Sequence, residues 1–157
     1  MIRIICVGKI KENYLRDAIE EYTKRLSKYT KLELVEVMDV DNPSVDITLS
    51  KEKENILKYV NPKDYIITLE IDGNMIDSVE FSKKMNKLFI TNSCITFIIG
   101  GSYGLHDAIK KMSNYKLSFS KMTFPHQLFR VILLEQIYRS FKINNNESYH
   151  KWYDFFN

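Results

Sequence analysis

Residues 117–127 read Leu-Ser-Phe-Ser-Lys-Met-Thr-Phe-Pro-His-Gln, and this stretch decides how the rest of the chain is interpreted. It follows a glycine-rich turn at 99–104, Ile-Gly-Gly-Ser-Tyr-Gly, by about one helix and one strand. Turns at the ends of neighbouring strands can form one ligand pocket at the carboxyl edge of an α/β sheet. We therefore expect these two segments to face a common pocket.

Strand-like and helix-like segments alternate along the chain. The apolar periodicity predicts strands at 2–7, 31–38, 65–71, 94–99 and 115–119, and helices at 11–28, 49–60, 77–90, 105–112 and 125–143. Asp77 and Glu80 have the spacing of a capping box. Residues 39–48, rich in Asp, Asn and Pro, are predicted to form a loop, and 72–74 a turn that ends the third strand. This order predicts an α/β fold in one domain over 1–157, with a mostly parallel sheet sandwiched by helices.

The composition limits the class of protein. No apolar run is long enough to span a bilayer, and the first residues lack the features of a signal peptide. Cys6 and Cys94 lie in apolar, strand-like runs and are expected to be reduced core residues. The three histidines are far apart and lack clustered Cys or Asp partners, which predicts no metal site. We therefore expect a cytoplasmic protein that uses neither a membrane nor a metal.

The basic surplus is confined to the last third of the chain. Residues 1–100 hold 15 Lys and Arg against 16 Asp and Glu, whereas residues 101–157 hold 8 against 4. A basic surface beside a pocket attracts a polyanion such as RNA through phosphate contacts. Scattered, solvated lysines explain the same numbers, so charge alone leaves both interpretations open.

Two turns have the composition of a ligand site. Three of the five glycines fall within 100–104, but their spacing matches neither the dinucleotide fingerprint nor a P-loop, so a plain tight turn remains an alternative. In 118–124, backbone groups could hydrogen-bond an adenine edge while Phe119, Met122 and Phe124 cover its faces. The alternative for this loop is hydrophobic packing onto the core.

Candidate catalytic groups are few. His150, in an aromatic tail, is a candidate general base. His126, at the start of the last helix, is expected to have a structural or capping role. Arg130 and Arg139 on the same helix could bind phosphate, and ion pairs are the alternative for each.

Several motifs together resemble a known family. They are 99–102, 117–127, 135–139 and the pair Tyr149-His150, and the similarity extends from Val7-Gly8-Lys9 to the tail. These segments are similar to the bacterial rRNA methyltransferases of the SPOUT class that modify N3 of a pseudouridine in the large subunit. The resemblance implies a trefoil knot over about 94–143, S-adenosylmethionine as cofactor, and a homodimer in which the second subunit completes the RNA site.

The resemblance also implies particular residues and a substrate. The cofactor-binding positions are Leu69, Gly100, Phe119, Ser120, Lys121, Met122, Thr123 and Phe124. Beside these positions, our candidates for RNA contacts are Arg130, Arg139 and Tyr149, and His150 is our candidate for orienting the target base or accepting its proton. The implied target is a pseudouridine in helix 69 of 23S rRNA, within the large subunit or the assembled ribosome.

The tail departs from the family pattern. Residues 145–147 are Asn-Asn-Glu where the family has an Arg-Gly-Glu-like run, and residues 151–157 extend past His150, which puts substrate recognition by the tail in doubt. Two other classes remain open on sequence alone. One is a non-catalytic RNA-binding module with the same fold. The other is a flavin or NAD binder, which the missing fingerprint disfavours.

Overall fold

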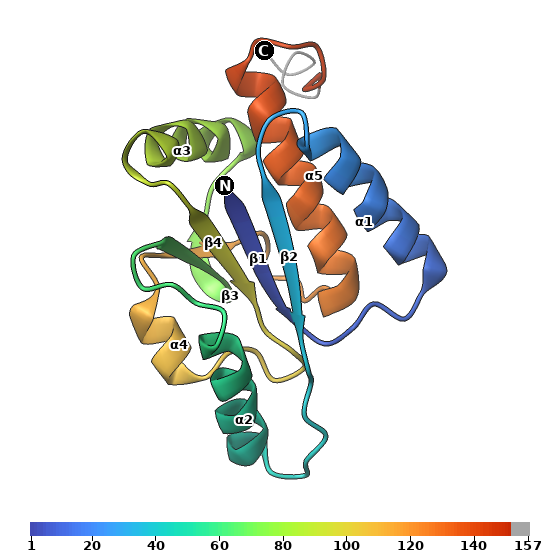
Figure 1. The fold of residues 1–157 in the computed structure, drawn as a ribbon, viewed down its shortest axis with the longest axis vertical. Helices are drawn as coiled ribbons and strands as arrows, with labels where there is room; N and C mark the ends of the chain where they lie inside the picture. Colours follow the sequence, from blue (N-terminus) through green and yellow to red (C-terminus); the bar gives the residue numbers. More distant parts are fainter. Residues whose placement is uncertain (152–157) are drawn as a thin grey trace.

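The computed structural model describes residues 1–151 and contains one five-stranded sheet with helices on both faces (Figure 1). In chain order the elements are β1 Ile2–Val7, α1 Asn13–Leu26, β2 Leu32–Val37, α2 Val45–Leu57, β3 Tyr65–Met75, α3 Ser78–Thr91, β4 Ile95–Ile99, α4 Asp107–Met112, β5 Tyr115–Ser118 and α5 His126–Asn144. The strand order is β2-β1-β4-β3-β5, and all four pairings are parallel. The predicted parallel α/β fold is confirmed.

Each face of the sheet is covered by its own set of helices. Because side chains alternate along a strand, Ile4 and Cys6 of β1 pack under α1, α3 and α5, whereas Ile5 and Val7 pack under α2 and α4. The central strand β4 is buried at all five positions, as expected where both faces are covered. Helix α5 contacts both α1 and α3, and Figure 1 shows α1 and α5 side by side.

Two predicted boundaries were wrong. The second helix begins at Val45 rather than at 49, because the Ser44 side chain caps it by accepting a hydrogen bond from the Ile47 amide at 3.3 Å. Strand β3 does not end at 71. It has an irregularity in which Leu69 and Asn74 both pair with Leu117, so residues 70–73 bulge out at the carboxyl edge of the sheet before pairing resumes.

Other local predictions are confirmed. Asp77 and Glu80 form the expected capping box of α3, with reciprocal side-chain to backbone hydrogen bonds of 2.8 and 3.1 Å. Cys6 and Cys94 are free and buried. Burial raises the pKa of the Cys6 thiol to about 12, so this thiol stays protonated and unreactive at neutral pH.

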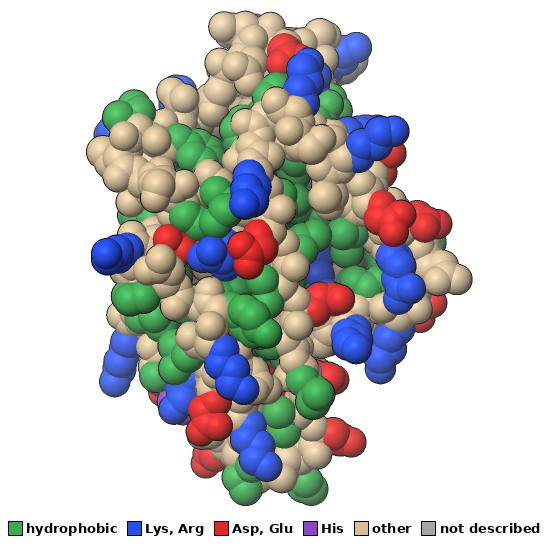
Figure 2. Space-filling view, viewed as in Figure 1, with side chains coloured by type: hydrophobic (Ala, Val, Ile, Leu, Met, Phe, Trp, Pro, Cys, Tyr) green, Lys and Arg blue, Asp and Glu red, His purple; other side chains and the backbone are tan. Residues whose placement is uncertain are grey.

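The exposed surface carries both signs of charge. On the face shown in Figure 2, Lys and Arg side chains are interspersed with Asp and Glu and form no block of one sign. Within residues 1–151 no helix is long and apolar enough to cross a membrane.

Candidate active site

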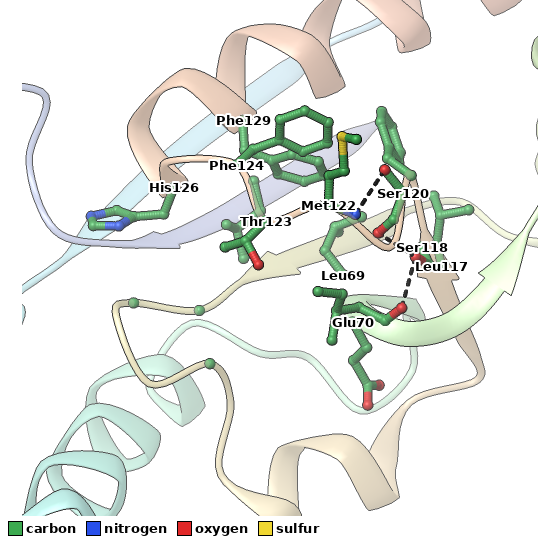
Figure 3. Close-up of a pocket in the computed structure, with 16 residues that line it drawn as sticks. Leu69, Glu70, Leu117, Ser118, Ser120, Met122, Thr123, Phe124, His126 and Phe129 are labelled. Atoms are coloured by element: carbon green, nitrogen blue, oxygen red, sulfur yellow. Dashed lines mark hydrogen bonds between the residues drawn. The ribbon is translucent and has the colours of Figure 1, made fainter.

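A cavity of about 160 Å³ lies beyond the carboxyl ends of β3, β4 and β5. Ligands of parallel α/β sheets bind at this edge. Figure 3 shows the cavity between the loop that follows β5 and the end of β3. Its lining comprises Leu69, Glu70, Ile71, Ile99, Gly100, Gly101, Gly104, Leu117, Ser118, Phe119, Ser120, Met122, Thr123, Phe124, His126 and Phe129.

The bulge in β3 shapes one wall of this cavity. It presents Glu70 and Ile71 beyond the last regular pair of the strand. The Ser118 hydroxyl donates to the Ile71 carbonyl at 3.0 Å, which ties the bulge to the end of β5. At Gly73 a Cβ would lie 2.8 Å from the Lys116 carbonyl oxygen, so the close approach of the two strands requires glycine.

The glycine turn forms a second wall. The Gly104 amide donates to the Gly101 carbonyl at 3.0 Å, and Gly104 has a positive φ of 78°. A Cβ at Gly100 would overlap the backbone carbonyl of Gly104. The turn therefore closes only with glycine at position 100 and leaves its backbone facing the cavity.

The loop after β5 forms the third wall and is held by its own contacts. The Ser120 hydroxyl accepts a hydrogen bond from the Met122 amide at 2.9 Å. Phe119 packs edge-on against Phe129 of α5, with ring centroids 4.9 Å apart, and Phe124 stacks on the same ring at 6.1 Å. The loop thus has an apolar side anchored on α5.

The same loop also presents unused backbone donors. The amides of Lys121, Thr123 and Phe124 hydrogen-bond to no group within residues 1–151. Met122 is 77% exposed, so its side chain is available to cover a ligand. A purine can bind such a loop, because apolar side chains cover the faces of its rings while backbone amides donate hydrogen bonds to its edge.

The structure brings together seven of the eight residues expected to bind a cofactor. Leu69, Gly100 and the loop residues all line the cavity except Lys121, which is exposed and lies outside the lining. Their role in binding a cofactor stays a prediction.

Arg130 occupies an interior position. Its side chain is 2% exposed, donates to the carbonyls of Val7 at 3.1 Å and Gly8 at 2.7 Å, and pairs with Glu36 at 2.7 Å. The guanidinium thus holds the end of β1 and has no open surface for a phosphate. We therefore do not include Arg130 among the residues proposed to contact RNA. An ion pair was the alternative role expected for Arg130, and this ion pair is present with Glu36.

The remaining predicted residues form a cluster at the other end of α5. Arg139 donates to Glu135 at 2.5 Å and to His150 Nδ1 at 2.9 Å, and it lies over the ring of Tyr149. The Tyr149 hydroxyl also donates to Glu135, at 3.1 Å. Arg139 lies 13 residues after His126, which is about 20 Å along a helix. Within one copy of the chain, this cluster is therefore remote from the cavity.

Sequence reasoning missed two residues of α5 that line the cavity, His126 and Phe129. Of the structural or capping role expected for His126, the capping part was wrong, because Pro125 occupies the N-cap and no side chain of the described residues caps this helix. The signal that could have found them is their separation of three residues, which puts both on the face that meets the strand ends. Within residues 1–151 no three His, Cys, Asp or Glu side chains are grouped to hold a metal ion.

The comparisons with known proteins identify the family. A family model described as "Predicted SPOUT methyltransferase" matches residues 1–150. Proteins named ribosomal RNA large subunit methyltransferase H from Clostridium botulinum (strain Alaska E43 / Type E3) and Clostridium kluyveri are 54% and 52% identical to this chain, and each match covers 96% of this chain and 99% of the relative.

Two solved structures share the fold at low sequence identity. A "probable methylase family protein" from Haemophilus influenzae Rd KW20 superposes with a TM-score of 0.56 at 18% identity, covering 96% of this chain and 70% of the other. A "Probable Methyltransferase" from Bordetella pertussis Tohama I gives 0.57 at 10% identity, covering 88% and 93%. The fold is thus that of a SPOUT methyltransferase. The chain belongs to the family of ribosomal RNA large subunit methyltransferase H.

Proposed function

We propose that this enzyme transfers a methyl group from S-adenosylmethionine to N3 of a pseudouridine in helix 69 of 23S rRNA, within the large subunit or the assembled ribosome. The observation that carries the proposal is the cavity itself. It gathers Leu69, Gly100 and every residue of the loop 119–124 except Lys121, which are seven of the eight positions implied by the family resemblance. The names of the relatives support rRNA as the substrate.

The cavity residues fit the proposed cofactor. Leu69, Met122 and Phe124 supply apolar cover for an adenine, and the free amides of the loop supply donors for its edge. The glycine turn, which a Cβ at Gly100 would disrupt, allows the backbone to approach the ligand closely. S-adenosylmethionine supplies an activated methyl group, so the protein needs only to align it with N3 and assist removal of the N3 proton.

We further propose that the enzyme acts as a homodimer in the cytoplasm. In one copy Arg139, which contacts Glu135, Tyr149 and His150, lies about 20 Å along α5 from His126, and none of these four residues lines the cavity. A second copy is therefore the simplest source of these groups at the reacting base. Met75, Met122 and Leu128 are exposed apolar side chains near the cavity end of the fold and are available for such an interface.

Substrate contacts then divide between two surfaces. Lys121, exposed on the cavity loop, is placed to contact RNA phosphates. Arg139 and Tyr149 act from the second copy, where His150 orients the target base. The target must be reachable, either in a loop or flipped out of its stack. We also propose that residues 94–143 form the trefoil knot of the family, which the parallel sheet and the family membership support. The Trp152–Asn157 part of the tail extension lies outside the described residues.

The decisive experiment is transfer of labelled methyl from S-adenosylmethionine to ribosomes that lack this modification. Mass spectrometry then maps the product nucleotide, and already modified ribosomes serve as the control. We expect label on N3 of the helix 69 pseudouridine in the unmodified ribosomes alone. Label on a different nucleotide refutes the target. No label, with cofactor binding demonstrated by calorimetry, refutes the proposed reaction.

A further inference from the structure

His126 lines one end of the cavity with a ring that has no hydrogen-bond partner among the described residues. It is the first residue of α5 and the one histidine of the three that belongs to the lining. Figure 3 shows it at the opposite end from Ser118 and Ser120. Its ring makes no hydrogen bond to any group in the described chain, and its nitrogens are not among the enclosed, unpartnered atoms. A lone pair of this ring is therefore free to accept a proton from a molecule in the cavity.

The other two histidines have their Nδ1 atoms engaged. His106 Nδ1 accepts a hydrogen bond from the Ala108 amide at 3.0 Å and so caps α4. His150 Nδ1 lies 2.9 Å from a guanidinium nitrogen of Arg139, and since arginine only donates, Nδ1 is the acceptor. His150 is thereby oriented by a hydrogen bond from Arg139, which suits a residue that positions a base.

The surroundings of His126 favour the neutral ring. Burial lowers the pKa of His126 below 6.5, and the positive charges of Arg130 and Lys11 lower it further, against an opposing effect of Asp39. Arg130 is fixed in place by its bonds to the Val7 and Gly8 carbonyls, so its cation cannot move away from the ring. At neutral pH the imidazole is thus unprotonated and able to act as a base.

Gly104 leaves open space in the wall of the cavity to which His126 also belongs. Within the described residues no atom lies within 4 Å of a Cβ built on Gly104. The His126 ring also lies next to the end of β1, because its Nε2 is 3.6 Å from where a Cβ on Gly8, a residue outside the lining, would stand. A larger residue at position 104 would fill part of the open space.

We propose that His126 is the group that accepts the N3 proton of the target base during methyl transfer. This inference rests on the proposed function. In the step, the bond between the methyl carbon and the sulfonium sulfur breaks and its electron pair stays on sulfur, which becomes a neutral thioether. N3 forms the bond to the methyl carbon with the electrons of its N–H bond. The proton moves to the His126 imidazole, which becomes the imidazolium and later releases it to water.

The test is the pH dependence of single-turnover methylation in the wild type and in His126→Gln. Glutamine keeps a polar side chain of similar reach but cannot accept a proton at neutral pH. The methylation rate of the wild type should fall as pH drops through a value below 6.5, and this decrease is the acid limb of the pH profile. His126→Gln should be about 10²- to 10⁴-fold slower, as expected for loss of a general base, and its profile should lack the acid limb. His150→Gln should be slower but keep the limb, and His106→Asn, which can still cap α4, should retain both rate and limb.

Three controls separate the possible failures. Calorimetry should show unchanged cofactor affinity in His126→Gln, and His126→Asn provides a second variant if glutamine prevents folding. The imidazole pKa of His126 in the wild type, measured by NMR, should coincide with the acid limb of the rate. A disagreement between the two values, or a full rate with an intact limb in a His126 variant, overturns the assignment while leaving the proposed function standing. Absence of methylation by the wild type overturns the proposed function itself.

Discussion

Replacing Arg130 distinguishes a structural arginine from one that contacts RNA. Methionine is the informative substitute, because it keeps the length and apolar volume of the stem while removing the guanidinium. The wild-type guanidinium makes bonds of 2.7 Å and 3.1 Å to the carbonyls of Gly8 and Val7 and a 2.7 Å contact with Glu36. The change therefore removes three interactions that hold the end of β1 against α5.

The expected cost follows from the burial of each partner. Hydrogen bonds from a charged donor contribute about 1.5–3 kcal/mol each, and this applies to the two carbonyl bonds. Glu36 is 40% exposed, so water can solvate its carboxylate after the change, and the pair contributes at most about 1 kcal/mol. Arg130 Nε is buried without a hydrogen-bond partner among residues 1–151, and its removal returns about 1–3 kcal/mol. The midpoints of these ranges give a net loss of about 3 kcal/mol, which corresponds to a Tm lower by roughly 6–12 °C in a domain of this size.

Urea unfolding at neutral pH measures this loss, with Lys121→Met as the matched exposed control that leaves the midpoint unchanged. Ribosome binding is then compared at equal fractions folded. We expect Arg130→Met to lose stability but to keep the salt dependence of binding, whereas Lys121→Met should lower the salt slope by about one unit. An Arg130→Met protein with an unchanged urea midpoint and weakened RNA binding would refute the structural interpretation.

Three further changes test other parts of the structure. Gly100→Ala should weaken cofactor binding at least about tenfold in calorimetry. The new Cβ would overlap the Gly104 carbonyl and force the turn to move at a cost of about 1–3 kcal/mol. Ser102→Ala, in the exposed part of the same turn, is the control and should leave the affinity unchanged. Glu52 is 4% exposed, and burial raises its pKa in the folded protein above that in the unfolded chain. The protonated form therefore stabilises the fold at low pH, and this stability is lost as pH rises through the folded-state pKa. Glu52→Gln should therefore be more stable than wild type at pH 7 but not below about pH 4, and equal pH profiles in urea unfolding would contradict this. Asp77→Ala should lower the stability by about 1 kcal/mol through loss of the α3 cap, measured as a Tm lower by about 2–4 °C, and an unchanged Tm would mean that the capping box contributes nothing.

The sheet and the cavity loop could be predicted from the sequence because their signals are local. Apolar runs such as 95–99 predict buried parallel strands, and the order of elements then places the ends of β3, β4 and β5 at one edge. Loop 119–124 follows β5 directly, so its place at that edge needs no long-range information. The cofactor assignment itself came from the family resemblance, because the glycine spacing at 100–104 matches no phosphate-binding motif.

Features that depend on distant partners could not be predicted in the same way. The bulge of β3 exists because residue 74 pairs again with Leu117, a partner some forty positions away in the chain. The burial of Arg130 depends on carbonyls at the end of β1 and on Glu36 at a separation of 94 residues. From a helical pattern alone an arginine is expected to be exposed, because arginine is rarely buried unless it is paired. The sequence does not show which distant residue would pair with it.

The two ends of α5 explain why a list of functional residues does not by itself define an active site. His126 at its beginning belongs to the cavity, and Arg139 near its end holds Tyr149 and His150 in a separate cluster. A straight helix keeps these ends about 20 Å apart, and no side chain spans that distance. If both ends serve one reaction, each cavity must combine the beginning of α5 from one copy with the end of α5 from another. A mixture of His126→Gln and His150→Gln proteins should then recover activity in hybrid dimers, because one cavity would combine an intact His126 with an intact His150 of the other copy. Two variants that remain inactive when mixed, with hybrid formation shown by mass spectrometry, would contradict this shared arrangement.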